Sequence, residues 1–431
     1  MAHSLELLVS VLERNIDNRG KTPPLSPMGY PLIEVKHIQE DHIYPVFEDT
    51  KYVDQATWDT WFRAHLEPGD ILFSTVGSIA RSCMVPEKPK FCIAQNVLGF
   101  RVDRSKADPR FVYYAINDSF FQHEVHGRTI ETVQKSIKVH DLKTCRIPLP
   151  SLPEQHAIAN ILGTLDDKIE LNRQMNETLE AMARALFKSW FVDFDPVRAK
   201  AEGRDPGLPK PIADLFPDSF EDSELREIPK GWEVGPLDSV LVLQRGFDLP
   251  ATRRTSGAYP VLAASGPSGT HNEFMVRGPG VTTGRSGVLG KVFYVDDDFW
   301  PLNTSLWVKE FRHSRPAYAF HLLRGIDFAM FNAGSAVPTL NRNHVHNLPT
   351  LLPPMGLIDA FEQVATSSLK RQKHNDHQSR TLATMRDTLL PKLISGELRV
   401  RAANNLVQEA TACQSRIISP HLAKNPSTKR L

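Results

Sequence analysis

The sequence predicts an α+β fold in which two similar globules of mixed α/β structure are each followed by a long helix. The length of 431 residues exceeds the ~100–200 residues of a typical domain, so two or more domains are expected. A set of motifs occurs twice in the same order, and two segments carry apolar residues at heptad spacing. Hydrophobic residues at 41% and charged residues at 23% are typical of a globular protein.

The internal repeat begins with residues 77–81 (GSIAR), which resemble residues 287–291 (GVLGK). Both follow an apolar or Thr-rich run and predict strand, tight turn and strand. Three further pairs follow in the same order: 94–98 with 302–306, the aromatic segment 111–115 with 317–321, and 136–150 with 339–354. Four matches in one order indicate a duplicated architecture.

The first helix is predicted over residues 151–196, where steps of four and three residues produce a coiled-coil seam. Pro153 suits a first helical position, and Glu154 adds negative charge in the first turn. The seam positions are Ile158, Leu162, Leu165, Ile169, Asn172, Asn176, Leu179, Ala183, Leu186 and Trp190. A Pro/Gly-rich linker is predicted at 197–229.

The second helix is predicted over residues 353–398, and Gly396 marks its end. Its apolar positions are Leu357, Phe361, Val364, Leu369, Leu382, Met385, Leu389 and Leu393. The repeat offset places Asn375 opposite Asn172, and such a polar pair would fix the register if the helices pair. We expect the pairing to rest on Ile158, Leu162, Leu165, Ile169, Asn172, Leu179, Leu186, Phe361, Leu382 and Leu389. For Asn176, a solvent-facing position is equally open.

Charge is segregated along the chain, although the net charge is only +1. Residues 1–150 carry −1, 151–225 carry −7, 226–350 carry +3 and 351–431 carry +6. The acidic segment is unsuited to a phosphate backbone, whereas the two basic segments are able to attract one. A solvated basic face is the alternative interpretation.

Several kinds of site are not supported by the sequence. The four cysteines form no C-x-x-C pair, and His344 and His346 lack further ligands at metal spacing, so no metal is expected. Residues 284–292 resemble a phosphate loop, but Arg285 replaces its first Gly and Val292 its Ser/Thr. Asp193 and Asp195 lie beside a proline, where a capping or turn role is favoured over acid–base catalysis.

Neither catalysis nor membrane insertion is indicated by the remaining patterns. The motifs of an adenine methyltransferase are absent, so catalysis by this chain alone is not expected. Glu6 and Glu13 interrupt the N-terminal apolar run, and no run approaches the ~18 apolar residues of a membrane span. We therefore expect a cytoplasmic location.

Three segments give the chain a recognisable similarity. Residues 149–155 (LPSLPEQ), 161–172 (ILGTLDDKIELN) and 185–196 (ALFKSWFVDFDP) resemble the specificity (S) subunits of Type I restriction–modification systems. The resemblance covers residues from about 1 to 400. It implies target-recognition domains at 1–150 and 230–352, separated by an antiparallel pair of spacer helices in a pseudo-two-fold repeat, with a flexible basic tail at 399–431.

The same resemblance implies a non-catalytic subunit that reads double-stranded DNA, one half of a bipartite target per recognition domain. The helices would dock two methyltransferase (modification) subunits, which carry S-adenosylmethionine, and ATP-dependent translocase/nuclease (restriction) subunits would join them. No cofactor is expected on this chain. The second helix lacks the Glu154–Gln155 pair of the first, so the two docking surfaces are expected to differ.

Candidate DNA contacts are polar residues beside the Gly turns, because Arg and Asn/Gln recognise G and A in the major groove. In the first globule they are Ser74, Thr75, Ser78, Arg81, Gln95, Asn96, Arg128, Thr129 and Lys135. In the second they are Arg245, Thr283, Arg285, Ser286, Lys291, Asn303, Thr339, Asn341 and Arg342. A coiled-coil scaffold without DNA binding and a self-sufficient nucleic-acid-modifying enzyme remain alternatives.

Overall fold

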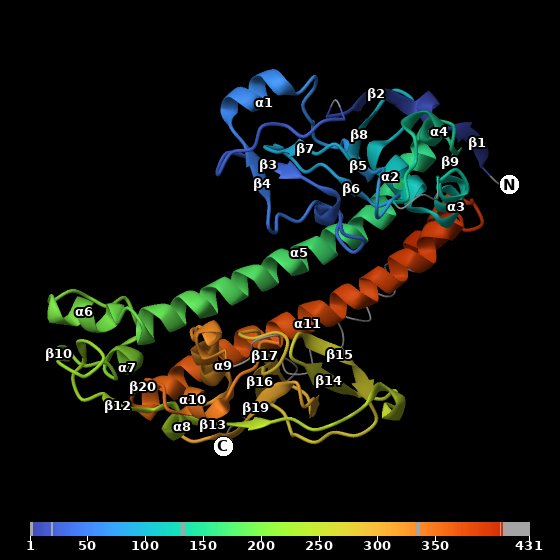
Figure 1. Cartoon of the computed structure of the whole chain (residues 1–431). Helices are drawn as coiled ribbons and strands as arrows, with labels where there is room; N and C mark the ends of the chain where they lie inside the picture. The colour runs from blue at the N-terminus through green and yellow to red at the C-terminus, as the bar shows by residue number, and fades with distance from the viewer. Residues whose placement is uncertain (1–2, 19, 131–133, 333–336, 406, 408–431) are drawn as a thin grey trace, which may run out of the picture. The chain divides into compact units, whose positions relative to one another are not determined.

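The computed structural model describes residues 3–18, 20–130, 134–332, 337–405 and 407 (Figure 1). The chain divides into two compact units. Unit 1 comprises Met1–Gln174 with Asn375–Leu431, and unit 2 comprises Met175–His374. Each unit therefore contains one globule together with about half of each long helix, so the helices are shared between the units.

Unit 1 contains a mixed globule built on an antiparallel four-stranded sheet. Its strands are β1 (Ser4–Leu7), β2 (Leu12–Ile16), β3 (Tyr30–Ile33), β4 (Lys51–Val53), β5 (Ile71–Ser74), β6 (Ser82–Met84), β7 (Cys92–Ile93), β8 (Val97–Val102) and β9 (Arg146–Leu149). Its helices are α1 (Gln55–Trp61), α2 (Pro109–Asn117), α3 (Ser119–Gly127) and α4 (Val139–Lys143), with short 3-10 turns at Leu8–Val11 and Val35–His37. The sheets run β2-β8-β5-β6, β4-β3-β7 and β1-β9.

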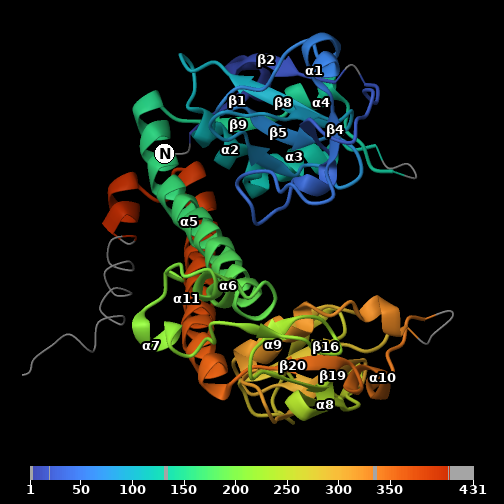
Figure 2. The ribbon, with the colours of Figure 1, turned by 90° about the vertical axis from the view of Figure 1, so that its left-hand side faces the viewer.

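Unit 2 repeats this plan. Its strands are β12 (Glu233–Pro236), β13 (Leu241–Arg245), β14 (Tyr259–Ala263), β15 (Gly266–His271), β16 (Gly280–Gly284), β17 (Val292–Val295), β18 (Trp300–Pro301), β19 (Ser305–Phe311) and β20 (Pro349–Leu352). Its helices are α8 (Leu237–Val240), α9 (Pro316–Arg324) and α10 (Arg342–His346), with 3-10 turns at Ala251–Arg253 and Phe328–Phe331. Helix α9 packs against β16 and β17, and Figure 2 shows it beside β16.

The sheet orders of unit 2 are β13-β19-β16-β17, β15-β14-β18 and β12-β20, which match those of unit 1 strand for strand. Even the directions agree, because β3–β7 and β14–β18 are both parallel pairs within otherwise antiparallel sheets. The predicted α+β fold class and internal repeat are confirmed.

The aromatic segments of the repeat form α2 and α9, which pack on these sheets. Pro109 and Pro316 each occupy the first turn, where a proline loses no intrahelical hydrogen bond. Asp108 caps α2 by accepting a hydrogen bond from the Phe111 N–H at 2.9 Å. Both helices bury most of their residues, so each links its sheet to the adjacent long helix.

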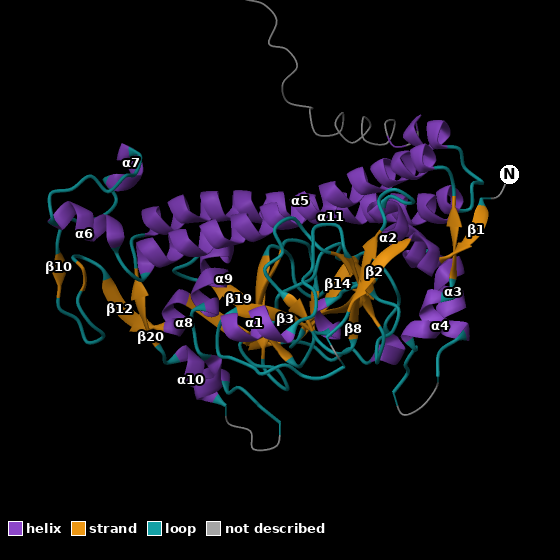
Figure 3. Ribbon diagram, turned by 90° about the horizontal axis from the view of Figure 1, so that it is seen from above, coloured by secondary structure: helices purple, strands orange, loops and turns teal. Residues whose placement is uncertain are grey.

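The two long helices are α5 (Leu152–Phe191) and α11 (Met355–Ile394), of 40 residues each. In unit 1 Asp166 contacts Arg386, and Asn172 contacts Gln378; in unit 2 Asn176 contacts the Gln372 carbonyl. In unit 2 the Phe187 ring also lies 5.5 Å from that of Phe361. Partner numbers thus fall along α11 as they rise along α5 in both units, so the halves pair antiparallel within each unit (Figure 3).

Most expected pairing residues face into the units. Ile158, Leu162, Leu165, Asn172, Phe361, Leu382 and Leu389 are buried, and Ile169, Leu179 and Leu186 are partly buried. Val364 differs from the expectation, since it is 45% exposed, whereas Ala365 is fully buried. The seam of α11 passes one residue further along, because the spacing from Phe361 is four residues rather than three.

Two other segments are more ordered than the sequence predicts. The Pro/Gly-rich linker contains α6 (Asp195–Ala201), α7 (Lys210–Ala213) and the hairpin of β10 (Phe220–Glu221) with β11 (Ile228–Pro229). Its Phe216 and Ile228 side chains are buried in the core of unit 2. In the tail, residues 400–405 are helical and Ala403 is buried against unit 1, while 408–431 lie outside the described residues.

Candidate nucleic-acid interface

Three segments of unit 1 meet beyond the end of β5. The Thr75 N–H donates to the Asn96 carbonyl at 3.0 Å, and the Ile137 N–H donates to the Thr75 carbonyl at 3.0 Å. The Gly77 N–H donates to the Lys135 carbonyl at 2.9 Å. We call residues 75–81, 95–96 and 135–137 tip 1.

Unit 2 builds the same arrangement with equivalent residues. The Arg285 N–H donates to the Thr304 carbonyl at 2.8 Å, and the Leu340 N–H donates to the Arg285 carbonyl at 2.8 Å. The Gly287 N–H donates to the Pro338 carbonyl at 2.9 Å. We call residues 285–291, 303–304 and 338–340 tip 2.

The turns within the two tips share an unusual backbone conformation. Gly77 has φ of 81° and its counterpart Gly287 has φ of 85°, a region that favours glycine. At the next left-handed position, tip 2 has Gly290 with φ of 79°, while tip 1 has Ala80 with φ of 66°. The turn is thus conserved between the units even where its glycine is not.

Tip 1 brings most of the predicted contacts of the first globule together. Ser78, Gln95 and Lys135 are exposed, and Arg81 and Asn96 are partly exposed. A hollow of about 530 Å³ beside the turn is lined by Ser78, Arg81, Lys135 and their neighbours. A second hollow of about 360 Å³ is lined by Gln95, Asn96 and two basic residues absent from the prediction, Lys36 and Lys51.

Some predicted contacts support the tips from inside instead. Ser74 is fully buried and its hydroxyl donates to the Ser78 carbonyl at 2.6 Å, while the Thr75 hydroxyl donates to the Asn96 carbonyl at 3.2 Å. Thr283 is also buried. Ser74 and Thr283 present no surface to a ligand, because strands β5 and β16 are covered on both faces. Thr75, the residue after β5, is only 8% exposed.

Arg128 and Thr129 are turned toward the end of α3. The Arg128 guanidinium donates to the Glu124 carbonyl at 2.8 Å and pairs with its carboxylate at 3.3 Å. The Thr129 hydroxyl donates to the Val125 carbonyl at 3.0 Å. Both side chains therefore stabilise the helix C-terminus rather than joining tip 1.

In unit 2, Arg285, Ser286, Asn303 and Thr339 are partly exposed in tip 2, and Lys291 is exposed there. Arg245 lies at the end of β13, and the exposed Asn341 and Arg342 begin α10, where the Asn341 side chain caps the helix through the Asn343 N–H. Sequence reasoning missed Asp248, which accepts a hydrogen bond from the Asn303 amide. The one signal in the sequence is its position three residues after Arg245, which suits an ion pair between the two side chains.

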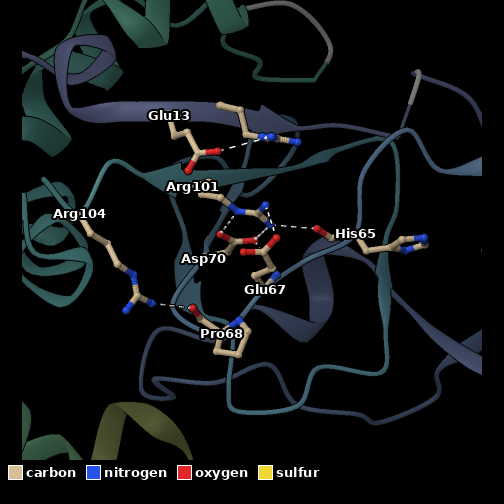
Figure 4. A network of polar contacts seen from close by, with 8 residues as sticks. Glu13, His65, Glu67, Pro68, Asp70, Arg101 and Arg104 are labelled. Carbon is tan, nitrogen blue, oxygen red and sulfur yellow. Dashed lines mark hydrogen bonds and ion pairs between the residues drawn. The ribbon is translucent and has the colours of Figure 1, made fainter.

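A cluster of ion pairs around the buried Asp70 and Arg101 holds the other end of β5 (Figure 4). The Arg101 guanidinium donates to both carboxylate oxygens of Asp70 at 3.0 and 2.9 Å, and to Glu67 at 2.5 Å. The hydrogen bond to Asp70 raises the pKa of Arg101. Because Asp70 immediately precedes β5, this cluster anchors the strand that leads into tip 1.

Large pKa shifts occur away from the tips. Burial raises the pKa of Cys92 to about 12 and that of Cys145 to about 11, so both thiols are poor nucleophiles. Burial among aromatic rings lowers the pKa of His321 to about 4.

Among the described residues, no three His, Cys, Asp or Glu side chains are grouped as metal ligands would be. None of the described helices is apolar over a length that could span a membrane.

The two globules share one topology, and each packs on the paired helices and presents a polar tip. The protein therefore has two separate candidate sites that are built in the same way. A family model described as the Type I restriction modification DNA specificity domain matches residues 27–181 and 229–364. The chain belongs to this family, and the resemblance seen in the sequence is confirmed.

Two specificity subunits are similar to this chain over most of its length, and one solved structure shares its fold. The Type I restriction enzyme MjaIX specificity subunit of Methanocaldococcus jannaschii is 26% identical over 341 residues, 72% of this chain and 74% of that protein. The HindI specificity subunit of Haemophilus influenzae is 24% identical over 407 residues, 77% of this chain and 87% of that protein. The crystal structure of the S subunit from M. genitalium matches with a TM-score of 0.56 and 18% identity, covering 91% of this chain and 96% of that one.

Proposed function

We propose that this chain is the DNA sequence-recognition subunit of a Type I restriction–modification complex. Each globule reads one half of a bipartite target, and the chain is not catalytic by itself. The observation that carries the proposal is the pair of tips: the same three backbone hydrogen bonds build both, but the exposed side chains differ. One scaffold that carries two sets of polar side chains suits the reading of two different half-sites.

The chemistry of the tips fits DNA. Arg81 and Lys135 in tip 1, and Lys291 in tip 2, carry positive charge for phosphate contacts, which position a protein on the duplex. Gln95 and Asn303 carry amides able to pair with base edges, which specify the sequence. We assign the target-recognition domains to residues 1–150 and 230–352, and the spacer helices to 151–196 and 353–398.

The helices are the proposed docking surfaces for partner subunits. Leu171 and Met182 on α5 and Val364 on α11 are 50%, 62% and 45% exposed, although they are large apolar side chains. We propose that two methyltransferase subunits bearing S-adenosylmethionine cover these helices, and that restriction subunits join the assembly. The specificity chain then brings the target adenine to the methyltransferase, where base flipping requires accurate placement.

Exchange of one globule tests whether each globule recognises its own half of the target. Residues 1–150 are replaced by those of a relative with a different target, and methylated adenines are mapped by single-molecule sequencing in a host that lacks other systems. We expect one half of the modified sequence to change and the other to stay. A change in both halves would contradict the proposal.

A second experiment separates this proposal from the alternatives of a scaffold and a self-sufficient enzyme. The purified chain is incubated with DNA and S-adenosylmethionine, and its DNA affinity is measured by filter binding at low and moderate salt, alone and with its partners. We expect no methyl transfer by the chain alone and an affinity that falls steeply with salt. Methyl transfer would indicate an enzyme, and no binding even with partners would indicate a scaffold.

A further inference from the structure

The backbone of Arg285 is fixed within tip 2 by hydrogen bonds on both sides. Its N–H and carbonyl are bonded to two different segments, at Thr304 and Leu340, both at 2.8 Å. Its guanidinium Nη1 donates to the Asn303 carbonyl at 3.3 Å. No other described residue accepts a hydrogen bond from this guanidinium, so most of its five donors stay available beside Asn303.

The neighbouring Asn303 amide has a defined orientation. Its Nδ2 donates to Asp248 Oδ1, and the atom beside a carboxylate must be the amide nitrogen, because an ionised carboxylate only accepts. The Asn303 Oδ1 receives no hydrogen bond from any residue that the structure describes, so it is presented as an acceptor. Arg245 Nη2 lies 3.9 Å from the same Asp248 oxygen and partly neutralises it.

The guanidinium N–H donors of Arg285 lie beside Asn303, whose Oδ1 is an acceptor. This combination matches the hydrogen-bonding groups of one kind of base pair. In the major groove a G·C pair shows two adjacent acceptors on guanine, N7 and O6, and then the N4 amino donor of cytosine. An A·T pair alternates acceptor, donor and acceptor, so it offers a guanidinium no adjacent pair of acceptors.

We propose that Arg285 and Asn303 together read one G·C pair in the half-site of unit 2. Arg285 contacts the guanine, Asn303 Oδ1 accepts from the cytosine amino group, and Asp248 is the positioning residue that keeps Asn303 in this orientation. The inference rests on the proposed function and deepens it. Tip 1 lacks this device, since Thr75 occupies the position of Arg285 and uses its hydroxyl internally.

The test uses the complete complex in a host that lacks other adenine methylation, with methylated adenines mapped for each variant. For Arg285→Gln we expect the preference for one G·C pair in one half-site to fall by roughly 5- to 150-fold, the range of a bidentate contact, while the other half stays unchanged. Asp248→Asn should relax the same position less strongly, because an asparagine side chain also donates and lets the Asn303 amide turn.

A matched control is Lys309→Gln on β19, an exposed cation of the same unit outside tip 2, which should leave the whole motif unchanged. A measurement without any variant uses the wild-type complex on duplexes in which 7-deazaguanine replaces each guanine of this half-site in turn. One substitution should weaken binding at least about 5-fold, because it removes the N7 acceptor.

The outcomes separate the two proposals. A wild-type map without a bipartite motif would overturn the proposed function. A bipartite motif whose relevant half contains no G·C pair, or in which Arg285→Gln, Asp248→Asn and 7-deazaguanine all leave every position unchanged, would overturn the G·C assignment and leave the proposed function standing.

Discussion

The two units join helix to globule at the same place with different chemistry. In unit 1, the Tyr114 hydroxyl on α2 donates to the buried Asp166 carboxylate at 2.6 Å, and Arg386 pairs with Asp166 at 2.7 Å. In unit 2 the sixth residue of α9 is His321 instead, which stacks on Phe187 with ring centroids 5.7 Å apart. One backbone arrangement is thus stabilised by a buried ion pair in one unit and by aromatic packing in the other.

The starts of α2 and α9 show a second difference of this kind. In unit 1, Gln155 on α5 is buried and its Oε1 accepts from the Asp108 N–H at 3.0 Å. In unit 2, Glu362 on α11 accepts from the Ala317 and Tyr318 N–H groups at 3.1 and 3.0 Å. The second helix lacks the glutamine, but Glu362 satisfies two N–H groups in the first turn of α9, whereas Gln155 satisfies the N–H of the α2 N-cap residue.

The largest effect that distinguishes the units is expected from Phe361→Ala. Phe361 is fully buried, and its ring lies 5.5 Å from that of Phe187 and 5.6 Å from that of Phe191. Removing a buried Phe side chain costs roughly 4 kcal/mol of unfolding free energy through lost burial and the cavity left behind. Native-state hydrogen exchange should show lost protection on α9 and the nearby half of α5, with unit 1 unaffected.

The control for this change is Val364→Ala, at the exposed position one turn along α11, where we expect an effect within about 0.5 kcal/mol. Equal loss of protection in both units after Phe361→Ala would mean that the aromatic cluster does not belong to unit 2 alone.

Arg386→Met tests the ion pair of unit 1. The substitution leaves the Asp166 carboxylate, whose side chain is 3% exposed, without its cation. Breaking such a pair costs roughly 3 kcal/mol, because an uncompensated charge stays buried. The double variant Arg386→Met with Asp166→Asn removes both charges and should recover most of the loss in urea denaturation. If the double variant were no more stable than the single one, the loss of stability would not come from the unpaired Asp166 charge.

One component of the pH dependence should come from His321 in unit 2. Burial lowers the pKa of His321 to about 4, below its unfolded value, so the unfolded chain binds a proton first as pH falls. Stability is therefore complete above about pH 6.5 and declines toward pH 4, by about 2 kcal/mol between pH 7 and 5 from this group. The variant His321→Phe, which keeps an aromatic ring, should lose this component. An unchanged slope in the variant would assign the pH dependence to other groups.

The smallest effect concerns the polar contact in the seam of unit 1. Asn172 is buried, and its Nδ2 donates to Gln378 Oε1 at 2.9 Å and to Ser379 Oγ at 3.2 Å. Asn172→Ala should cost about 1 kcal/mol and raise exchange locally on α11 near residue 378. Asn176→Ala is the matched change in unit 2, and an equal or larger effect there would contradict the special role of Asn172.

Local patterns in the sequence were sufficient for the helices. The heptad run predicts a helix over 151–196, and α5 spans Leu152–Phe191, because spacing of 3.5 residues is a property of consecutive residues alone. The Gly77 and Gly287 turns were also predictable, since only the local backbone requires glycine there. Val364 was misplaced because an apolar residue at a three-residue step fits the pattern as well as Ala365 at a four-residue step.

The contents of the tips depended on the tertiary structure. Ser74 and Thr283 are predicted DNA contacts because they are polar residues beside the Gly turns, but each lies in a strand covered on both faces, and no local signal reports what covers a strand. The Asp248 contact to Asn303 joins residues 55 positions apart, so neither residue alone predicts it. The sequence by itself determined the repeat and the helices, because these depend on neighbours in the chain. Only the fold decided which loops meet and which side chains they expose, because distant segments come together only when the sheet orders are set.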